Sequence, residues 1–375
     1  AEFCRTTLKG VGCRLDNDNG TEWTAYTPSY RPDMSLEPDL IEEIGRVYGL
    51  DRIEPTLPKV SRSLQPGTED CLYAFHMALK RWAAGLGLNE AVNYSFVGQK
   101  DLDNLNMPKE GRLPIANPLS AELDVMRTEI APGLLNTLRQ NLAQGASGIR
   151  VFELARSFVF SAESETTAHE VNRLGLLLYG SRYDNFWPQE QADADYQDIK
   201  GLVEHFSLFF KLPQVGFVNC EGGHPYLLPC VRVSIDGQDV GVIGRFKPEI
   251  ADIYHARKDV WYADLNADVL FRLVSGRSVL FSPLPQFPPV RRDITIISPP
   301  GLTIKEILDK SREIKMPLLE EVELIDLYSP KGEETRNLTF RFTFRHKERT
   351  LKDGEVDHER ERMAEFLLKS LPVRI

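Results

Sequence analysis

The sequence lacks the features of a membrane-spanning or an exported protein. No stretch reaches about 18 consecutive apolar residues, the length that a transmembrane helix requires. The first residues, Ala-Glu-Phe-Cys, do not form the basic and then apolar pattern of a signal peptide. An initiating methionine is also missing. We therefore expect a piece of a longer protein that functions without a membrane.

Cysteine is scarce, and its pattern argues against a disulfide framework or a zinc site. The chain has five cysteines, an odd number, and no Cys-x-x-Cys pair. The seven histidines are scattered, so closely spaced zinc ligands are missing from the sequence. Free thiols in a reducing compartment are the simplest interpretation, which predicts a cytoplasmic protein.

Motifs of self-sufficient catalysis are missing as well. The sequence contains neither the phosphate-binding patterns G-x-x-x-x-G-K-[ST] and G-x-G-x-x-G nor the catalytic patterns H-E-x-x-H and G-x-S-x-G. Residues 16–20, Asp-Asn-Asp-Asn-Gly, resemble a calcium-binding loop, but the glycine comes one position too early and Thr27 replaces the bidentate glutamate. We interpret these residues as a turn, and no other pattern indicates an independent active site.

Length and charge are those of an acidic multidomain protein. The 375 residues, of which 42% are hydrophobic and 27% charged, suffice for two or three domains of roughly 150 residues each. The net charge of −10 argues against a surface that binds nucleic acid uniformly. Residues 284–375 contain 17 basic and 17 acidic side chains, so the remainder carries the whole excess. A polyanion would therefore meet the least repulsion at this C-terminal segment.

The first segment, residues 1–57, is predicted to contain a strand and a helix. An Asn-Gly pair at residues 19–20 indicates a turn before a strand over Thr21–Thr27. A helix is expected over residues 38–48, with its apolar side chains on one stripe, and Gly49 ends it. The stretch that follows is interpreted as a linker because it contains Pro55, Pro58 and Pro66.

The second segment, residues 67–276, alternates between predicted helices and strands. Helices are expected over Glu69–Leu86, Pro132–Gln144 and Ile199–Leu208. Strands are expected over Glu90–Phe96, Arg150–Phe160, Arg173–Tyr179, Cys230–Ile235, Asp239–Phe246 and Val260–Leu265. This order predicts an antiparallel or mixed sheet flanked by helices.

The third segment, residues 284–375, has the element order of a ferredoxin-like fold. A strand, a helix, two strands and a helix are expected, followed by a short final strand. Their ranges are Asp293–Ser298, Thr303–Ile314, Leu318–Tyr328, Arg336–Arg345 and Asp353–Leu371. In Arg336–Arg345 apolar residues alternate with arginine and threonine, so one face is predicted to pack under the helices and the other to meet solvent or phosphate. The chain as a whole is thus predicted to be an α+β multidomain protein.

Three groups of residues, in sequence order, carry a family resemblance. Pro28-Ser29-Tyr30-Arg31-Pro32-Asp33 and the segment 37–51, which begins Glu-Pro-Asp-Leu-Ile-Glu-Glu-Ile-Gly-Arg, are similar to the B5 domain of the phenylalanyl-tRNA synthetase β subunit. The catalytic-like domain of that subunit is resembled by residues 117–120 (Asn-Pro-Leu-Ser), 126–128 (Met-Arg-Thr), 132–135, 152–154 and 240–249. Its anticodon-binding domain is resembled by residues 287–294, 344–345 and 349–351. Together the three groups cover nearly the whole chain.

The resemblance implies three domains. They are a partial B5 domain of winged-helix-like type (residues 1–57), a non-catalytic class II synthetase-like domain with an antiparallel sheet (67–276) and a ferredoxin-like anticodon-binding domain (284–375). The family's oligonucleotide-fold and editing domains do not fit before Asp33, so the chain resembles the C-terminal part of the subunit. Pro32 stands where the family commonly has arginine, and Phe246-Lys247-Pro248 lacks the family's common acidic, apolar and histidine run.

In function, the resemblance implies a supporting role in phenylalanine–tRNA ligase, an aminoacyl-tRNA synthetase. The α subunit would use ATP to activate phenylalanine and would transfer it to tRNA(Phe). This chain would contribute to the assembly of an α2β2 heterotetramer and to tRNA binding, without a catalytic residue of its own. The alternative is a non-enzymatic RNA-binding or scaffold protein built from the same modules. The full B5-to-anticodon order favours the subunit.

Four acidic residues form the candidate metal site. Asp39, Glu42 and Glu43 lie at positions i, i+3 and i+4 of the expected helix, so they share one face. Oxygen ligands suit Mg²⁺, and the resemblance implies a Mg²⁺ site at Asp33, Asp39, Glu42 and Glu43 that is shared with the α subunit. The alternative is that acidic side chains in the first turn only stabilise the helix through its dipole, which disfavours a cation there.

Arginines are the candidate nucleic-acid ligands. We expect Arg291, Arg292, Arg341 and Arg345 to contact tRNA phosphates from the strands of the third segment. The alternative is a solvated, ion-paired sheet face, since this segment contains equal numbers of both charges. Arg127 is of a type that could hold a nucleotide phosphate. No second arginine in a glycine-rich context completes such a site, so we interpret Arg127 as structural or interfacial.

Overall fold

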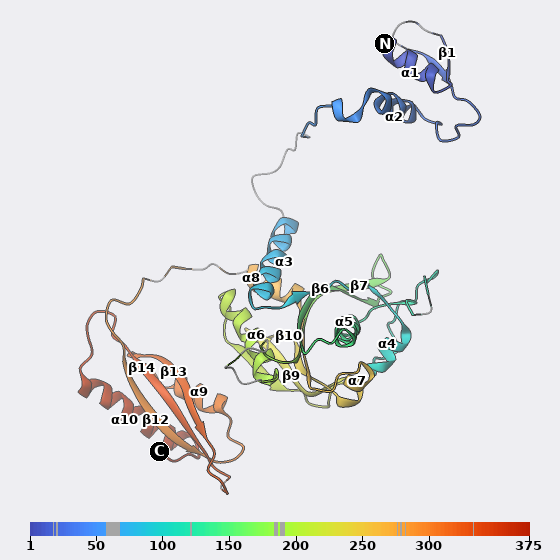
Figure 1. Ribbon diagram of the computed structural model, residues 1–375. Coiled ribbons are helices and arrows are strands. Elements are labelled where there is room, and N and C mark those ends of the chain that lie inside the picture. Colours follow the sequence, from blue (N-terminus) through green and yellow to red (C-terminus); the bar gives the residue numbers. More distant parts are fainter. Residues whose placement is uncertain are drawn as a thin grey trace. The chain divides into compact units, whose positions relative to one another are not determined.

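Two compact units make up the chain, Ala1–Ser275 and Gly276–Ile375 (Figure 1). The structure is a computed structural model that describes residues 1–17, 19, 22–57, 68–120, 122–183, 187, 192–275, 277, 280–281, 283–332 and 334–375. Within these residues, none of the helices combines the length and the apolar character needed to span a bilayer.

Residues 1–57 form a small helical module with its own core. Its elements are α1 (Glu2–Gly10), β1 (Arg14–Asp16), β2 (Thr24–Tyr26), α2 (Glu37–Tyr48) and the 3-10 helix η1 (Leu50–Arg52). Leu8, Cys13 and Met34 are buried between them. The predicted helix is confirmed and ends at Gly49, whose φ of 95° is the left-handed conformation that glycine adopts at low cost. Helix α1 was not predicted.

Parts of two predictions lie outside the described residues. The turn predicted over residues 16–20 includes Asp18 and Gly20, and the predicted linker includes Pro58 and Pro66. On either side of the turn, β1 and β2 pair in antiparallel fashion, with Arg14 opposite Tyr26. The described strand is therefore shorter than the predicted Thr21–Thr27.

A seven-stranded mixed sheet is the centre of residues 68–275. The strand order is β3-β6-β7-β11-β10-β9-β8, and every neighbouring pair is antiparallel except β3 and β6. The strands are β3 (Asn89–Glu90), β6 (Gly148–Phe160), β7 (Ala168–Gly180), β8 (Val215–Asn219), β9 (Leu227–Ile235), β10 (Gln238–Phe246) and β11 (Val260–Asn266). The prediction of an antiparallel or mixed sheet is confirmed.

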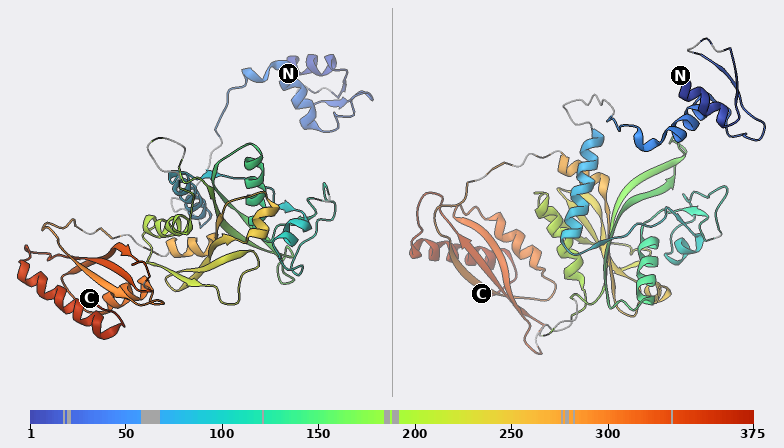
Figure 2. Two further views of the ribbon diagram at one scale, coloured as in Figure 1. Left: turned by 60° about the horizontal axis from the view of Figure 1, so that its bottom comes forward. Right: turned by 45° about the horizontal axis from the view of Figure 1, so that its top comes forward.

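Helices cover both faces of this sheet. On one face, α3 (Thr68–Gly85), α6 (Tyr196–Phe209) and α8 (Ala267–Ser275) belong to a core that includes Leu174 and Leu176 of β7. On the other, α5 (Ala131–Ala143) and α7 (Pro248–Ile253) belong to a core that includes Leu177 and Tyr179. Successive residues of a strand point to opposite faces, so β7 contributes to both cores. Figure 2 shows the sheet between α3, in blue, and α5, in green.

The strand predicted over Glu90–Phe96 is wrong. The chain leaves the large sheet after β3 and enters a separate two-stranded sheet, in which β4 (Phe96–Val97) pairs with β5 (Val125–Met126). Val92 is 88% exposed and Tyr94 is 75% exposed, so the residues between the two sheets form no buried strand face. Helix α4 (Gln99–Asn104), helices α7 and α8, and the edge strand β8 were not predicted.

The C-terminal unit is a three-stranded antiparallel sheet with two helices on one face. Its elements are β12 (Val290–Ser298), α9 (Ile304–Glu313), β13 (Leu319–Tyr328), β14 (Arg336–Phe344) and α10 (Asp353–Ser370). The strand order is β12-β14-β13, and Arg374 bridges to Ile297 in place of the short final strand.

The alternation predicted for β14 places its apolar side chains in the core of this unit. Leu338, Phe340, Phe342 and Phe344 are fully buried against residues of α9 and α10, including Ile307 and Met363. The ferredoxin-like prediction is thereby confirmed, and with it the α+β multidomain fold class.

Candidate metal centre and nucleic-acid interface

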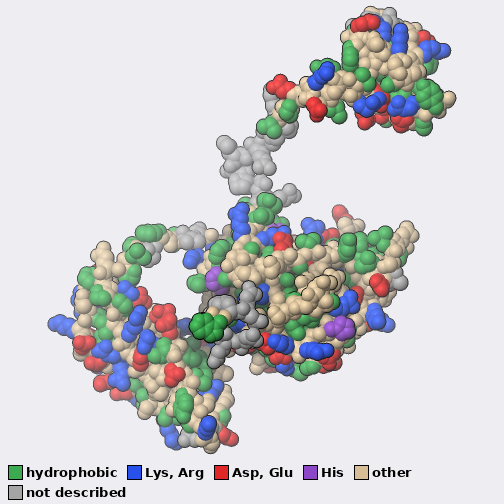
Figure 3. Space-filling view, in the orientation of Figure 1, with side chains coloured by type: hydrophobic (Ala, Val, Ile, Leu, Met, Phe, Trp, Pro, Cys, Tyr) green, Lys and Arg blue, Asp and Glu red, His purple; other side chains and the backbone are tan. Residues whose placement is uncertain are grey.

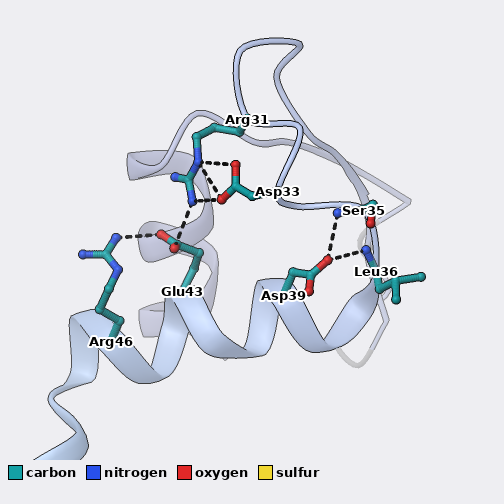
Figure 4. Close-up of polar contacts among 7 residues, drawn as sticks. All are labelled: Arg31, Asp33, Ser35, Leu36, Asp39, Glu43 and Arg46. Atoms are coloured by element: carbon teal, nitrogen blue, oxygen red, sulfur yellow. Dashed lines mark hydrogen bonds and ion pairs between the residues drawn. The ribbon is translucent and has the colours of Figure 1, made fainter. Parts of the chain in front are cut away.

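Asp39 marks the start of helix α2 rather than an open ligand position (Figure 4). Its Oδ2 atom accepts hydrogen bonds from the backbone N–H groups of Ser35 at 2.8 Å and Leu36 at 2.7 Å. Leu36 is the N-cap residue and Asp39 lies in the first turn, so this carboxylate reaches back to N–H groups just before the helix, closes its N-terminal end and favours the dipole. The carboxylate of Asp39 is thus already engaged by the backbone.

Arg31 joins Asp33 to Glu43. Its Nε donates to Asp33 Oδ1 at 3.0 Å, and its Nη2 donates both to Asp33 Oδ2 at 2.6 Å and to Glu43 Oε1 at 3.1 Å (Figure 4). Arg46 donates to the other oxygen of Glu43 at 2.6 Å. The side chain of Glu43 is only 10% exposed, so these two arginines hold a largely buried carboxylate between them.

These contacts keep both carboxylates ionised. Hydrogen bonds from Arg46 and then from Arg31 lower the pKa of Glu43 below its usual value. The hydrogen bonds from Arg31 likewise lower the pKa of Asp33, and the two carboxylates raise the pKa of Arg31. The cluster is therefore an internally neutralised ion-pair network.

The four predicted metal ligands do not fit a divalent cation as they are arranged. The guanidinium of Arg31 lies where Asp33 and Glu43 converge, Asp39 caps the helix, and Glu42 is exposed on α2. Within the part of the chain that the structure describes, no three acidic, histidine or cysteine side chains are placed to hold a metal ion. A cation here would need the displacement of Arg31 or ligands from another chain.

The four predicted tRNA ligands lie on two different faces of the C-terminal sheet. Arg341 and Arg345 are on the face that α9 and α10 leave uncovered, and Arg291 lies opposite Thr343, on the same face between them. Arg292 points to the helix-covered face, where it donates to Asp357 at 2.8 Å and to Asp353 at 2.9 Å. The structure therefore brings three of the four arginines together.

Two of these three arginines have acidic partners on the uncovered face. Arg341 binds both carboxylate oxygens of Asp293 at 2.9 Å, and Arg345 binds Glu320 at 2.8 Å. Arg291 is exposed, and among the described residues its side chain makes no hydrogen bond or ion pair. Basic and acidic side chains are intermixed over the side of this unit seen in Figure 3. Arg291 is thus the arginine most available to a phosphate.

Arg127 is enclosed within the first unit. Its Nη1 donates to Glu153 Oε1 at 2.7 Å and its Nε donates to the carbonyl oxygen of Arg156 at 2.8 Å. The side chains of Arg127 and Glu153 are only 3% and 2% exposed. Asn93 donates to the second oxygen of Glu153 at 2.8 Å, which completes the pair. This geometry gives Arg127 a structural role.

Sequence reasoning missed a second buried polar cluster in the first unit. Arg173 donates to Asp264 at 3.1 Å, and its Nη1 lies 3.8 Å from Glu129. Burial, and then the charge of Asp264, raises the pKa of Glu129 well above its ordinary value, which favours the neutral carboxyl form. The signal in the sequence was Asp264, which interrupts an otherwise apolar strand. The roles of Arg31 and Arg46 were also missed.

Three family models match the chain in sequence order. The tRNA synthetase B5 domain matches residues 1–50, the phenylalanyl-tRNA synthetase beta chain CLM domain matches residues 53–267, and the ferredoxin-fold anticodon-binding domain matches residues 285–375. The second model alone covers more than half of the chain.

Curated relatives match over nearly the whole chain. The phenylalanine–tRNA ligase beta subunit of Nitratidesulfovibrio vulgaris is 55% identical over 374 residues, which are 100% of this chain and 47% of the relative. The subunit of the same name from Oleidesulfovibrio alaskensis is 52% identical over 92% of this chain and 44% of the relative. That from Thermotoga maritima is 28% identical over 95% of this chain and 44% of the relative. The chain spans about half the length of these relatives.

A solved structure also shows a likeness to this chain. The crystal structure of pyrrolysyl-tRNA synthetase from Desulfitobacterium hafniense has a TM-score of 0.43 and 12% sequence identity, and the match covers 55% of this chain and 70% of that chain.

Proposed function

Since this chain belongs to the phenylalanyl-tRNA synthetase beta chain family, we propose that it supports the ATP-dependent attachment of phenylalanine to tRNA(Phe). In this proposal the chain assembles with a catalytic α subunit through residues 1–275 and binds tRNA through residues 285–375. The observation that carries it is the unbroken order of B5, CLM and anticodon-binding matches along one chain. A scaffold or RNA-binding protein would have no need for all three.

We propose further that the adenylate chemistry belongs to the α subunit, which would use the ATP. Arg127 supports this division, because its guanidinium is held in a buried ion pair and cannot reach a nucleotide phosphate without breaking that pair. The assembly that we propose is an α2β2 heterotetramer in the cytoplasm. The five cysteines, all free thiols, agree with a reducing compartment.

For Mg²⁺, we propose that any binding at Asp33, Asp39, Glu42 and Glu43 is confined to the assembled enzyme. In this chain three of the four carboxylates already accept hydrogen bonds from Arg31, Arg46 or the backbone. A shared site would therefore need oxygen ligands from the α subunit. No step of the reaction is assigned to such an ion.

Two binding measurements test the proposed function. The chain and its cognate α subunit should elute together in size-exclusion chromatography at low-micromolar concentration, whereas separate elution would favour the scaffold alternative. The complex should also bind tRNA(Phe), and removing residues 284–375 should weaken that binding in a salt-dependent manner. This deletion is suitable because the core of the C-terminal unit contains only residues of that unit. Unchanged tRNA affinity would exclude the anticodon-binding role.

A further inference from the structure

Cys220 and Cys230 lie opposite each other at the edge of the seven-stranded sheet. Cys220 directly follows β8, and Cys230 is in β9, one position beyond the paired residues Asn219 and Val231. The backbone N–H of Cys220 donates to the carbonyl oxygen of Cys230 at 3.0 Å, so the antiparallel ladder continues through this pair. The two Sγ atoms are in contact, and both residues are free thiols.

The backbone geometry suits a bond between the two side chains. Residues directly opposite each other across an antiparallel pair have Cα atoms about 4.5 to 5.5 Å apart, which lies inside the range of disulfides. Strand β8 is the last strand of the sheet and has β9 as its neighbour there, so it can adjust without disturbing a second strand. A bond between Cys220 and Cys230 would fasten this edge strand to the sheet.

We propose that Cys220 and Cys230 form a reversible thiol–disulfide site that is oxidised by hydroperoxides. The sulfur of Cys220 attacks the peroxide, the O–O bond breaks, and the departing oxygen leaves as an alcohol or water, so that Cys220 becomes a sulfenic acid. The sulfur of Cys230 then attacks the sulfur of Cys220, the S–O bond breaks, and hydroxide leaves with the thiol proton as water. Two thiols are oxidised, and one hydroperoxide is reduced.

The difference in exposure between the two thiols fixes their order of reaction. Cys220 is partly exposed, whereas Cys230 is buried. Burial, together with the neighbouring Cys220, raises the pKa of Cys230 to about 12, so Cys230 is the poorer first nucleophile. A neutral sulfenic acid at Cys220 removes the negative charge that contributes to this shift. The short distance between the sulfurs then favours the second step.

Peptide mapping of the full chain tests the proposal. The chain is treated with hydrogen peroxide, its remaining thiols are alkylated, and it is cleaved after Glu221, which lies between the two cysteines. We expect the peptides that contain Cys220 and Cys230 to stay joined until a reducing agent separates them. Three of the five cysteines should remain alkylated. The proposal would be overturned if both cysteines were still found alkylated after the peroxide treatment. It would also be overturned if Cys220 became a sulfinic acid and no link to Cys230 formed.

Two variants give matched comparisons. Cys220→Ser should abolish the link and leave Cys230 alkylated. Cys71→Ser removes an exposed thiol on α3, so it should retain the link between Cys220 and Cys230. In Cys220→Ser, a link between Cys230 and any other cysteine would contradict the proposal. It would show that exposed thiols react whether or not they lie opposite each other in the sheet. Because the mapping uses the unaltered chain first, its result holds even if a variant folds poorly.

Discussion

Arg341 and Asp293 face each other across β14 and β12, and the guanidinium donates to both carboxylate oxygens at 2.9 Å. The side chains of both residues are partly exposed, at 36% and 40%, on the sheet face that the helices leave uncovered. An exposed pair of this kind contributes little to stability. It does set how much positive charge this face presents to a polyanion.

We expect Asp293→Asn to strengthen tRNA binding. The substitution leaves the charge of Arg341 uncompensated, so one more phosphate can be neutralised. The slope of the logarithm of the tRNA association constant against the logarithm of the salt concentration should steepen by up to about 0.7 to 0.9. Filter binding of tRNA(Phe) over a range of salt concentrations measures both effects. Asp357→Asn makes the same charge change beside Arg292 on the helix-covered face. Equal gains from both variants would mean that the uncovered face is not the binding surface.

Arg291→Ala should weaken tRNA binding more than Arg341→Ala. Arg291 is exposed and, among the described residues, makes no ion pair, whereas Arg341 is already neutralised by Asp293. Loss of one phosphate contact should reduce the salt slope by about 0.7 to 0.9 for Arg291→Ala and by less for Arg341→Ala. Lys369→Ala, an exposed change on α10, serves as the control. The reverse order of effects would remove Arg291 as a phosphate ligand.

Glu355 should make the stability of the C-terminal unit depend on pH in acid. Arg349 donates to both of its oxygens at 2.8 and 2.7 Å, and this contact, with the N–H of Lys352, lowers the pKa of Glu355 from 4.5 to about 2. The folded pKa is the lower one, so the stabilisation is complete above pH 4.5 and is lost as pH falls towards 2.

Thermal unfolding between pH 7 and pH 2 measures this effect. Because the side chains of Arg349 and Glu355 are 47% and 37% exposed, solvent screens their interaction, so Glu355→Gln should lower the midpoint at pH 7 only slightly. The difference from the unaltered chain should vanish near pH 2. Glu365→Gln, also on α10 and 3.5 Å from Lys369, is the matched control for removing one exposed carboxylate. A difference for Glu355→Gln that stays constant down to pH 2 would contradict the assignment to the ionised carboxylate.

The sequence predicted much of this molecule because its signals were local. The stripe of α2 and the alternation of Leu338, Phe340, Phe342 and Phe344 reflect one buried face each, so periodicity identified them. The segment 90–96 failed because its residues serve two different sheets.

Side-chain partners were harder to predict than the elements. Spacing placed Asp39, Glu42 and Glu43 on one helix but could not show that Arg31, from the preceding loop, would reach Glu43. Likewise, the sequence placed Arg291 and Arg292 side by side. The predicted strand began only at Asp293, whereas β12 begins at Val290, so the alternation that sends these two arginines to opposite faces was not applied to them.

The chain alone should not bind Mg²⁺ at the acidic cluster. Arg31 occupies the space between Asp33 and Glu43, so isothermal titration with MgCl₂ should give no saturable heat. Arg31→Ala should produce weak binding, because it releases Asp33 and one oxygen of Glu43 while Arg46 still holds the other. It should also lower the midpoint of thermal unfolding. Arg52→Ala, which removes a cation beside the Tyr48 ring, should produce no binding. Saturable binding by the unaltered chain would refute the competition between Arg31 and the metal ion.

The Arg127–Glu153 pair provides the sharpest test of the structural role assigned to Arg127. Both side chains are almost fully buried, so removing one leaves the other charge without a partner. Breaking a buried ion pair in this manner costs about 3 to 5 kcal/mol, and we expect that loss for Glu153→Ala in urea unfolding. Arg156→Ala, on the same strand, removes an exposed pair with Glu170 and should cost about 1 kcal/mol or less.

Replacing both members of the buried pair distinguishes a structural role of Arg127 from a direct role in the reaction. The double variant Arg127→Met and Glu153→Leu exchanges the charges for apolar side chains, so it should recover much of the stability that either single change loses. If Arg127 is structural and the proposed function holds, the recovered variant should bind the α subunit and support aminoacylation to the same extent as the unaltered chain. A stable double variant that assembles normally but has lost aminoacylation would instead assign Arg127 a direct part in the reaction.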